Sequence, residues 1–233
     1  MQGFPPHPDV RVTLGNWQDP PFNRWAFSHL RELVPTQTIR NSSYVHPVAF
    51  EPDAAISDMP VGRTDGTTAP FLELLHDTYT DGIVIMHDDR IRYEQYFGHT
   101  GPFTNHLLMS VTKSVVGCVA GILIHRGVLH DDAPLTAYVP ELEGSGYAGA
   151  TVRNVLDMRS GVRFSEEYTD PEAEVNVMEE AFGWRPPSHD QTPRSIYEYL
   201  STLSRERDHG GIFDDRSAET LVLGWVCERA AGV

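Results

Sequence analysis

Two residues in the middle of the chain, Ser110 and Lys113, have the types and the spacing of a nucleophile and its activating base. The apolar sequence from Val111 to Ile124 predicts a helix that is buried on nearly every side. The three-residue spacing places Ser110 and Lys113 on one face of that helix. A buried lysine is costly unless its ammonium is paired or loses its proton. Since a neutral amine beside a hydroxyl is a general base beside a nucleophile, we interpret the pair in this way.

The composition strengthens this interpretation of Lys113. The chain has 18 lysines and arginines together, and Lys113 is the only lysine among them. Arginine keeps its proton in proteins, whereas a buried lysine can lose it. The alternative is a Ser-x-x-Lys pattern that occurs by chance on a solvated helix. The position of the single lysine favours the catalytic interpretation.

Several segments carry a resemblance to a known superfamily. Ser110-Val111-Thr112-Lys113 at the start of an apolar helix resembles the first motif of the serine β-lactamases and penicillin-binding proteins. The stretch 151–162 is similar to the one that follows in the class C and esterase-like branches. Three further segments narrow the resemblance to the 6-aminohexanoate-dimer hydrolases, which cleave nylon oligomers, and their carboxylesterase relatives: Trp17-Gln18-Asp19-Pro20-Pro21, Asn23-Arg24-Trp25-Ala26-Phe27 and Glu166-Glu167-Tyr168-Thr169-Asp170-Pro171.

The resemblance implies an α/β (α+β) fold of the β-lactamase/transpeptidase type, with an antiparallel sheet flanked by helices and a helical subdomain. It covers roughly the first three-fifths of the family's domain, so we expect the C-terminal sheet strands to be absent from this chain. We predict an N-terminal arm over 1–78, packed on the core, and the N-terminal portion of the hydrolase domain over 79–233. Within that portion, 79–127 hold a hairpin and the nucleophile helix, and 128–233 form the helical region.

An unpaired hairpin edge invites pairing with another strand. We therefore expect either a second chain, as a homodimer or as a complementing C-terminal chain, or a truncated product; the sequence leaves this choice open.

Three more site residues are implied by the resemblance. The family carries a Tyr-x-Ser or Tyr-x-Asn motif whose tyrosine shares in proton transfer, and Asp215 stands at that tyrosine's position. A carboxylate there stabilises a nearby ammonium, and a merely solvated loop residue is an equal alternative. Tyr168 matches a substrate-binding tyrosine of the family, which lies on a mobile loop and donates a hydrogen bond to the scissile amide. The alternative is a phenol that only packs against a helix. Glu179 falls near an acidic residue that meets the substrate's amino end, but we favour a solvated carboxylate.

Local patterns predict the elements that must position these residues. Gly82–Met86 is an apolar strand, Asp88 and Asp89 supply a turn, and the alternation over 90–97 predicts a second strand with one buried face. Trp17 and Trp25 are expected to anchor the N-terminal arm by packing. Helices are predicted around Trp25–Leu33, at Phe71–His76, from Val111 to Gly127, between Asp132 and Pro140, from Thr151 to Gly161, after Thr192, and from Ser217 to Gly232.

Composition excludes several classes of protein. At 233 residues, with 40% hydrophobic and 22% charged residues, the chain fits one soluble domain. Its net charge of −15 argues against nucleic-acid binding and adhesion to anionic membranes. No apolar run approaches the roughly 20 residues that span a bilayer, and Met1–Pro6 lack signal features, so we expect a cytoplasmic protein. Cys118 and Cys227 are expected to be buried thiols rather than a disulfide. We expect neither a metal nor another cofactor, because the histidines lack metal-binding spacing.

The leading interpretation is a serine hydrolase of β-lactamase-like fold that acts on small amides or esters through an acyl-enzyme. Ser110 attacks, Lys113 accepts its proton, and the backbone N–H of Ser110 contributes to an oxyanion hole. The rival interpretation is a non-enzymatic scaffold or partner subunit. Asp215 and the early stop of the chain favour the rival, whereas the single lysine favours the enzyme.

Overall fold

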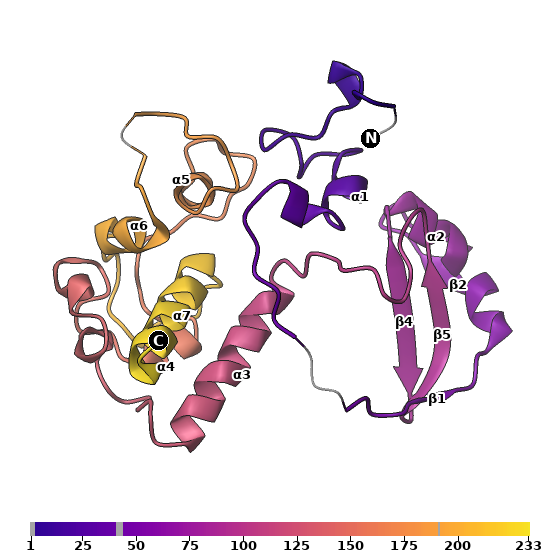
Figure 1. The fold of residues 1–233 in the computed structure, drawn as a ribbon. Helices are drawn as coiled ribbons and strands as arrows, with labels where there is room; N and C mark the ends of the chain where they lie inside the picture. Colours follow the sequence, from indigo (N-terminus) through magenta and orange to yellow (C-terminus); the bar gives the residue numbers. More distant parts are fainter. Residues whose placement is uncertain (1–2, 41–43, 191) are drawn as a thin grey trace. The chain divides into compact units, whose positions relative to one another are not determined.

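A computed structural model describes residues 3–40, 44–190 and 192–233 (Figure 1). Met1 and Gln2, part of the segment searched for signal features, lie outside the described residues. The chain forms two compact units, Met1–Leu107 and Leu108–Val233. The sequence placed a boundary after residue 78 instead.

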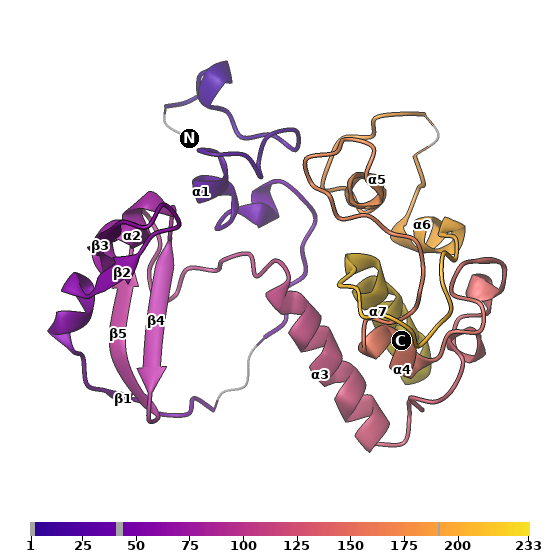
Figure 2. The same cartoon turned by 180° about the vertical axis from the view of Figure 1, so that it is seen from behind.

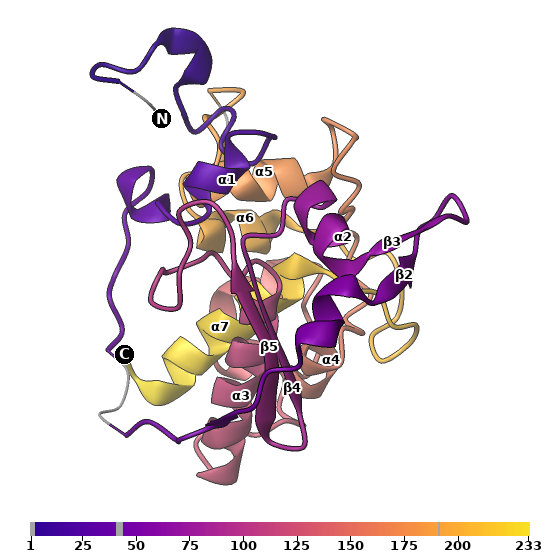
Figure 3. The same ribbon diagram turned by 90° about the vertical axis from the view of Figure 1, so that its right-hand side faces the viewer.

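The first unit contains a short sheet, a two-stranded ribbon and several short helices. Its strands are β1 (Ala49–Phe50), β2 (Pro60–Gly62), β3 (Thr68–Pro70), β4 (Gly82–His87) and β5 (Arg90–Tyr96). Its α-helices are α1 (Asn23–Ala26) and α2 (Phe71–Asp77), and its 3-10 turns are η1 (Pro8–Val10), η2 (Leu30–Glu32) and η3 (Ala54–Asp58). Figure 3 shows α2 and the β2–β3 ribbon beside the β4–β5 hairpin.

The predicted hairpin is confirmed. β4 and β5 pair antiparallel from Gly82 opposite Tyr96, and β1 adds a parallel partner to the other side of β5, so the sheet is mixed. Asp88 and Asp89 have φ angles of 51° and 57°. Two consecutive positive φ values are the geometry of a tight hairpin turn whose twist matches that of the strands.

Packing of aromatic side chains explains why the β4–β5 hairpin belongs to the same compact unit as the N-terminal residues. Tyr93 and Phe97 of the hairpin form one buried cluster with Leu75 of α2, which gives both elements a common core. The expected anchor Trp17 is confirmed as buried, with its ring 6.0 Å from that of Phe27. Trp25 stacks on His29.

The helix predicted over Trp25–Leu33 is wrong as a single element, since α1 ends at Ala26 and η2 begins at Leu30. The hydroxyl of Ser28 bonds back to the carbonyl of Trp25, which competes with the regular helical bonds.

The second unit is predominantly helical. Its α-helices are α3 (Val111–His125), α4 (Val152–Leu156), α5 (Glu174–Ala181), α6 (Ile196–Thr202) and α7 (Ser217–Ala231), with 3-10 turns η4 (Leu135–Ala137) and η5 (Pro140–Gly144). α3 and α7 lie side by side in Figures 1 and 2. Buried apolar side chains from all five α-helices form one core cluster.

The expectation that the helix at 111–125 is buried all round is wrong. One face, centred on Ala120, packs into the core, because α7 covers only that side. Cys118 is exposed, contrary to the prediction, whereas Cys227 on α7 is buried as predicted, and both thiols are free. Four large apolar side chains of α3 are 44 to 59% exposed: Val111, Val115, Val119 and Ile122.

The predicted helix ends agree with the structure where a cap or a left-handed residue fixes them, and the predicted helix lengths agree less well. Thr151 forms the capping box of α4 with Asn154, as expected for its N-terminus. The helix ends at Leu156 rather than at Gly161, since Met158 has a φ of 53°. Gly127 and Gly232 adopt left-handed conformations after α3 and α7, which confirms both predicted ends.

Two predicted boundaries differ. Pro140, predicted to end a helix, begins the 3-10 turn η5, and α6 is capped by Ser195 and not by residues at 192–193. Ser217 is the first residue of α7, after an Arg216 cap without a side-chain bond.

A buried polar network ties the start of α7 to the segment after α4. The Ser160 hydroxyl donates to Glu219 Oε1 at 2.6 Å, and Arg216 Nη1 lies 3.2 Å from the same oxygen. All three residues are buried. Burial raises the pKa of the Glu219 carboxyl, against the opposing effect of the bonds from Ser160 and Arg216.

Candidate functional site

The serine of the Ser-x-x-Lys pattern stands immediately before α3. Ser110 is exposed and has helical dihedral angles, and its carbonyl accepts the N–H of Lys113 at 3.0 Å. The preceding residue, Met109, has a φ of 45°. A left-handed conformation at a non-glycine residue costs about 1–3 kcal/mol and is enriched at functional sites. The backbone therefore turns sharply to present Ser110 at the helix start.

The Lys113 ammonium is held by Asp215. Lys113 Nζ donates to Asp215 Oδ1 at 2.7 Å. The lysine side chain is 16% exposed and the aspartate side chain is 63% exposed. Among the described residues this is the one hydrogen bond of the ammonium, so the structure joins Lys113 to Asp215 and not to Ser110. A carboxylate at this distance stabilises the charged form of the amine.

Asp215 occupies a segment between α6 and α7 that is tightly fixed. The neighbouring Asp214 accepts from Arg207 at 2.7 Å and from Arg216 at 2.6 Å, with both bonds on the same carboxylate oxygen. Its own N–H donates to the carbonyl of Met158 at 2.9 Å. These bonds hold the backbone on both sides of Asp215, which limits how far its carboxylate can move away from Lys113.

Tyr168 lies in an acidic neighbourhood. Its phenol donates to Glu166 Oε2 at 3.1 Å, and the other carboxylate oxygen of Glu166 accepts the backbone N–H of Ser217. Partial burial, followed by the charges of Glu166, Glu179 and Asp215, raises the pKa of Tyr168 to about 12. The phenol therefore keeps its proton at neutral pH and is suited to donate a hydrogen bond.

Glu179 is not a solvated carboxylate, and that preferred interpretation is wrong. The residue lies on α5, is 5% exposed, and pairs with the guanidinium of Arg185. The backbone turns after α5 so that the N–H of Trp184 donates to the Glu179 carbonyl, which returns the chain toward the helix. The pairing offsets the cost of burying the carboxylate.

Four of the five predicted site residues share one neighbourhood. Lys113 contacts Asp215. The charges of Asp215 and Glu179 contribute to the raised pKa of Tyr168. Ser110 lies one helical turn from Lys113, without a hydrogen bond from its hydroxyl to these residues in the described part of the chain.

Two contributors, Glu166 and Arg185, were not identified as site residues from the sequence. Glu166 stands two residues before Tyr168, and this short spacing could have identified it as a site residue. Arg185 gave none, because its role depends on the turn that follows α5.

The described part of the chain contains neither a metal cluster nor a membrane-spanning helix. Across 3–40, 44–190 and 192–233, no group of three histidine, cysteine or acidic side chains is arranged to hold a metal ion. In those same described segments, no helix combines the length and the apolarity needed to cross a bilayer.

Comparison with known proteins places this site in a family. The Beta-lactamase family model matches residues 73–233. The 6-aminohexanoate-dimer hydrolase of Paenarthrobacter ureafaciens is 40% identical over 226 residues, which cover 95% of this chain and 54% of that protein. The chain thus spans about half the length of this curated relative.

A solved structure has the same fold. A Bacillus anthracis protein, provisionally described as a 6-aminohexanoate-dimer hydrolase, superposes with a TM-score of 0.88 at 24% identity, over 98% of this chain and 60% of that one. This likeness confirms the predicted β-lactamase-like fold. With the family model covering both the Ser110 helix and the Asp215 segment, the chain belongs to the beta-lactamase family.

Proposed function

We propose that this chain is a serine hydrolase that acts on small amides or esters through an acyl-enzyme. The observation that carries the proposal is the position of Lys113. The only lysine of the chain lies one turn after Ser110, largely buried, at the start of α3. The 6-aminohexanoate-dimer hydrolase relative is named for cleaving an amide, and this name suggests the substrate class.

In the proposed reaction, Ser110 Oγ bonds to the substrate carbonyl carbon while its proton passes to the Lys113 amine. The developing oxyanion accepts a hydrogen bond from the backbone N–H of Ser110. The bond from the carbonyl carbon to the amine or alcohol then breaks, and the leaving group takes a proton. Water attacks the acyl-enzyme to release the acid and restore the serine.

The surrounding residues have separate roles in this scheme. Tyr168 turns its phenol O–H from Glu166 to the substrate in this scheme and donates a hydrogen bond there. Asp215 opposes the reaction, because its carboxylate occupies the Lys113 amine that the reaction needs as a base. We therefore expect slow ester hydrolysis and very slow amide hydrolysis, since the departure of an amine needs a proton more than that of an alcohol.

A fluorophosphonate probe tests the assignment of the nucleophile. The expected result is a covalent adduct that peptide mass spectrometry maps to Ser110, and that Ser110→Ala removes. Ser114→Ala is a matched control, because Ser114 lies on the same helix one residue after the lysine. An adduct at another residue, or labelling that survives Ser110→Ala, would refute the assignment.

A second candidate function is a non-enzymatic scaffold or subunit. The observation in its favour is the Lys113–Asp215 ion pair, which occupies the amine needed as a base. The exposed apolar face of α3 supports association with a second copy or with a complementing chain. Absence of labelling in a folded chain, together with a stable complex in native mass spectrometry, would favour this candidate.

A further inference from the structure

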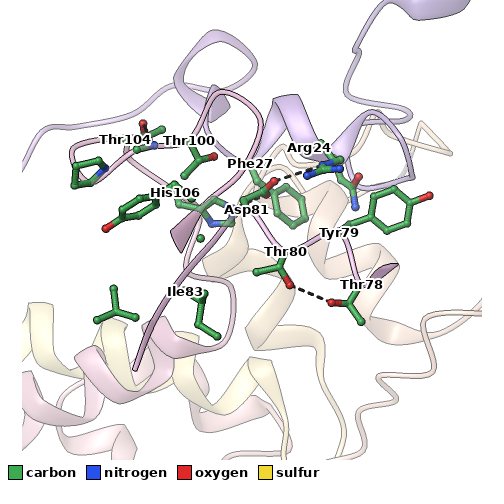
Figure 4. Close-up of a pocket in the computed structure, with 16 residues that line it drawn as sticks. Arg24, Phe27, Thr78, Tyr79, Thr80, Asp81, Ile83, Thr100, Thr104 and His106 are labelled. Atoms are coloured by element: carbon green, nitrogen blue, oxygen red, sulfur yellow. Dashed lines mark hydrogen bonds and ion pairs between the residues drawn. The ribbon is translucent and has the colours of Figure 1, made fainter. Parts of the chain in front are cut away.

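The first unit contains a cavity of about 620 Å³ that the proposed function does not use (Figure 4). α1, the segment 78–81 that leads into β4, and the segment 100–106 form its walls. A second cavity of about 610 Å³ shares Arg24 and Asp81 with the first. A volume of this size accommodates a small organic molecule.

The charged groups around these two cavities are unusual for this chain. The whole sequence has 33 acidic residues against 18 lysines and arginines. The linings of both cavities together contain one carboxylate, Asp81, and one guanidinium, Arg24, with three histidines: His29, His99 and His106. The lining thus lacks the excess of acidic side chains that the whole sequence has, so an anionic ligand meets little repulsion there.

The one carboxylate of the lining, that of Asp81, already has a protein partner for each of its oxygens. The side chain of Asp81 is 13% exposed and lies between Arg24 and His106, as Figure 4 shows. Arg24 Nε is 3.5 Å from one carboxylate oxygen, and His106 Nε2 is 3.1 Å from the other. With both oxygens engaged, Asp81 positions the two basic side chains and is not free to bind a ligand cation.

Arg24 retains donors that can hold a ligand. Its contacts are the ion pair through Nε and a position 5.5 Å from the ring centre of Tyr79. Within the part of the chain that the structure describes, its terminal amino groups donate to no protein acceptor. A guanidinium presents its terminal N–H groups in a planar fork that matches a carboxylate.

The remaining lining residues indicate the chemistry of the rest of the ligand. Apolar side chains of Phe27, Ile83 and Val84 line the cavity, and threonines 78, 80, 100 and 104 add hydroxyl groups. The hydroxyls of Thr78 and Thr80 bond to each other at 3.0 Å. A guanidinium and apolar residues in one cavity suit a molecule with one anionic end and a compact apolar body.

We propose that this cavity binds a small organic carboxylate, with the carboxylate on Arg24 and the apolar body against Phe27 and Ile83. The proposal does not depend on the hydrolase function, because every residue of this site belongs to the unit Met1–Leu107. The acid product of ester or amide hydrolysis is one member of the proposed ligand class.

A titration with benzoate, followed by two-dimensional NMR, tests the proposal. We expect benzoate to shift the resonances of residues around Arg24 in a saturable way, and its neutral analogue benzamide not to do so. Arg24→Leu should weaken the binding by about 10- to 100-fold, the loss expected for charge-assisted hydrogen bonds. Arg31→Leu, which removes an exposed arginine outside both cavities, should leave the affinity unchanged.

A second variant keeps the test decisive if Arg24→Leu fails to fold. Asp81→Asn removes the negative charge beside Arg24 and should retain or strengthen benzoate binding. Equal binding of benzoate and benzamide, an affinity unaffected by Arg24→Leu in a folded protein, or loss of binding in folded Asp81→Asn would each overturn the proposal.

Discussion

The ammonium of Lys113 lies 2.7 Å from the carboxylate of Asp215, one helical turn after Ser110. The partners come from α3 and from the segment before α7, 102 residues apart in sequence. This ion pair occupies the amine that the proposed reaction uses to accept the proton of the serine hydroxyl. Under the proposed function, the rate of hydrolysis would therefore depend on how easily Asp215 releases Lys113.

Removal of the Asp215 charge should make Lys113 more reactive toward amine reagents. Asp215→Asn removes the ion pair that holds the Lys113 amine, so the amine is freer to meet the reagent. Because Lys113 is the only lysine, a lysine-directed acylating reagent reports on this residue and on the chain terminus alone. Mass spectrometry of the modified peptide at pH 8 should show faster modification in the variant.

The matched control for this experiment is Glu172→Gln, which removes an exposed carboxylate elsewhere in the second unit. It should leave the rate at Lys113 unchanged. An equal rate in Asp215→Asn and in wild type would show that the ion pair does not govern the amine.

Restoration of the family's tyrosine should increase hydrolysis. Asp215→Tyr removes the ion pair and supplies a phenol that can relay a proton between lysine, serine and leaving group. A positioned acid–base group contributes about 10²–10⁴-fold to rate, so we expect roughly a 100-fold gain in kcat/KM for a p-nitrophenyl ester. Addition of Lys113→Arg should abolish the gain, since arginine retains its proton.

Asp215→Ala separates the two effects of that substitution. It removes the ion pair without supplying a phenol, and we expect a smaller gain than for Asp215→Tyr. Brisk amide hydrolysis by the wild type, together with no effect of Asp215→Ala, would show that another residue, with Tyr168 as the first candidate, supplies the proton.

Local sequence signals predicted the framework of the site. Gly82–Met86 with the two aspartates after it predicted the hairpin, and Ser110, Thr151 and Gly127 marked helix ends, because turns and caps depend on a few neighbouring residues. The pairing of Lys113 with Asp215 was accessible only through the family resemblance, since the two residues are far apart in sequence.

Tertiary packing limited the rest of the sequence prediction. The apolar pattern of α3 indicated burial on every side, but a sequence pattern does not say how many faces find a partner. α5 was missed because charged and amide residues interrupt its apolar positions. The burial of Glu179 depends on the guanidinium of Arg185 after the end of that helix.

The Arg185–Glu179 pair should restrict which acyl groups the site accepts. An acidic residue near this position meets an amino end in the resembled family, but here Arg185 neutralises the carboxylate. We expect Arg185→Gln to raise kcat/KM for an ω-aminoacyl ester relative to the matching unsubstituted ester by about tenfold, the factor for a gained charge interaction of about 1.4 kcal/mol. Arg194→Gln, an exposed arginine without a salt bridge in the described chain, is the control.

An unchanged ratio of the two esters in Arg185→Gln would show that Glu179 does not face the acyl group. The ratio, rather than the absolute rate, carries the test, because any loss of folded protein affects both substrates equally.

The buried carboxyl of Glu219 should make stability depend on pH in a defined direction. Its pKa is raised above the ordinary 4.5, chiefly by burial. Well below pH 4.5 the group is neutral in the folded and unfolded chains alike. As pH rises, the unfolded chain ionises first, so the wild type loses stability until the folded-state pKa is passed. Relative to Glu219→Gln, which cannot ionise, the wild type should therefore become less stable from pH 4.5 upward.

Urea unfolding of both proteins at half-unit steps from pH 4 to pH 7 measures this difference. Comparison with Glu219→Gln isolates one carboxyl, because the lowered pKa values of exposed groups such as Asp131 and Glu167 affect both proteins equally. Glu172→Gln should show a difference from wild type that hardly varies with pH. A wild type that gains stability relative to Glu219→Gln as pH rises would show that the Arg216 ion pair outweighs burial, and that the Glu219 pKa is lowered instead.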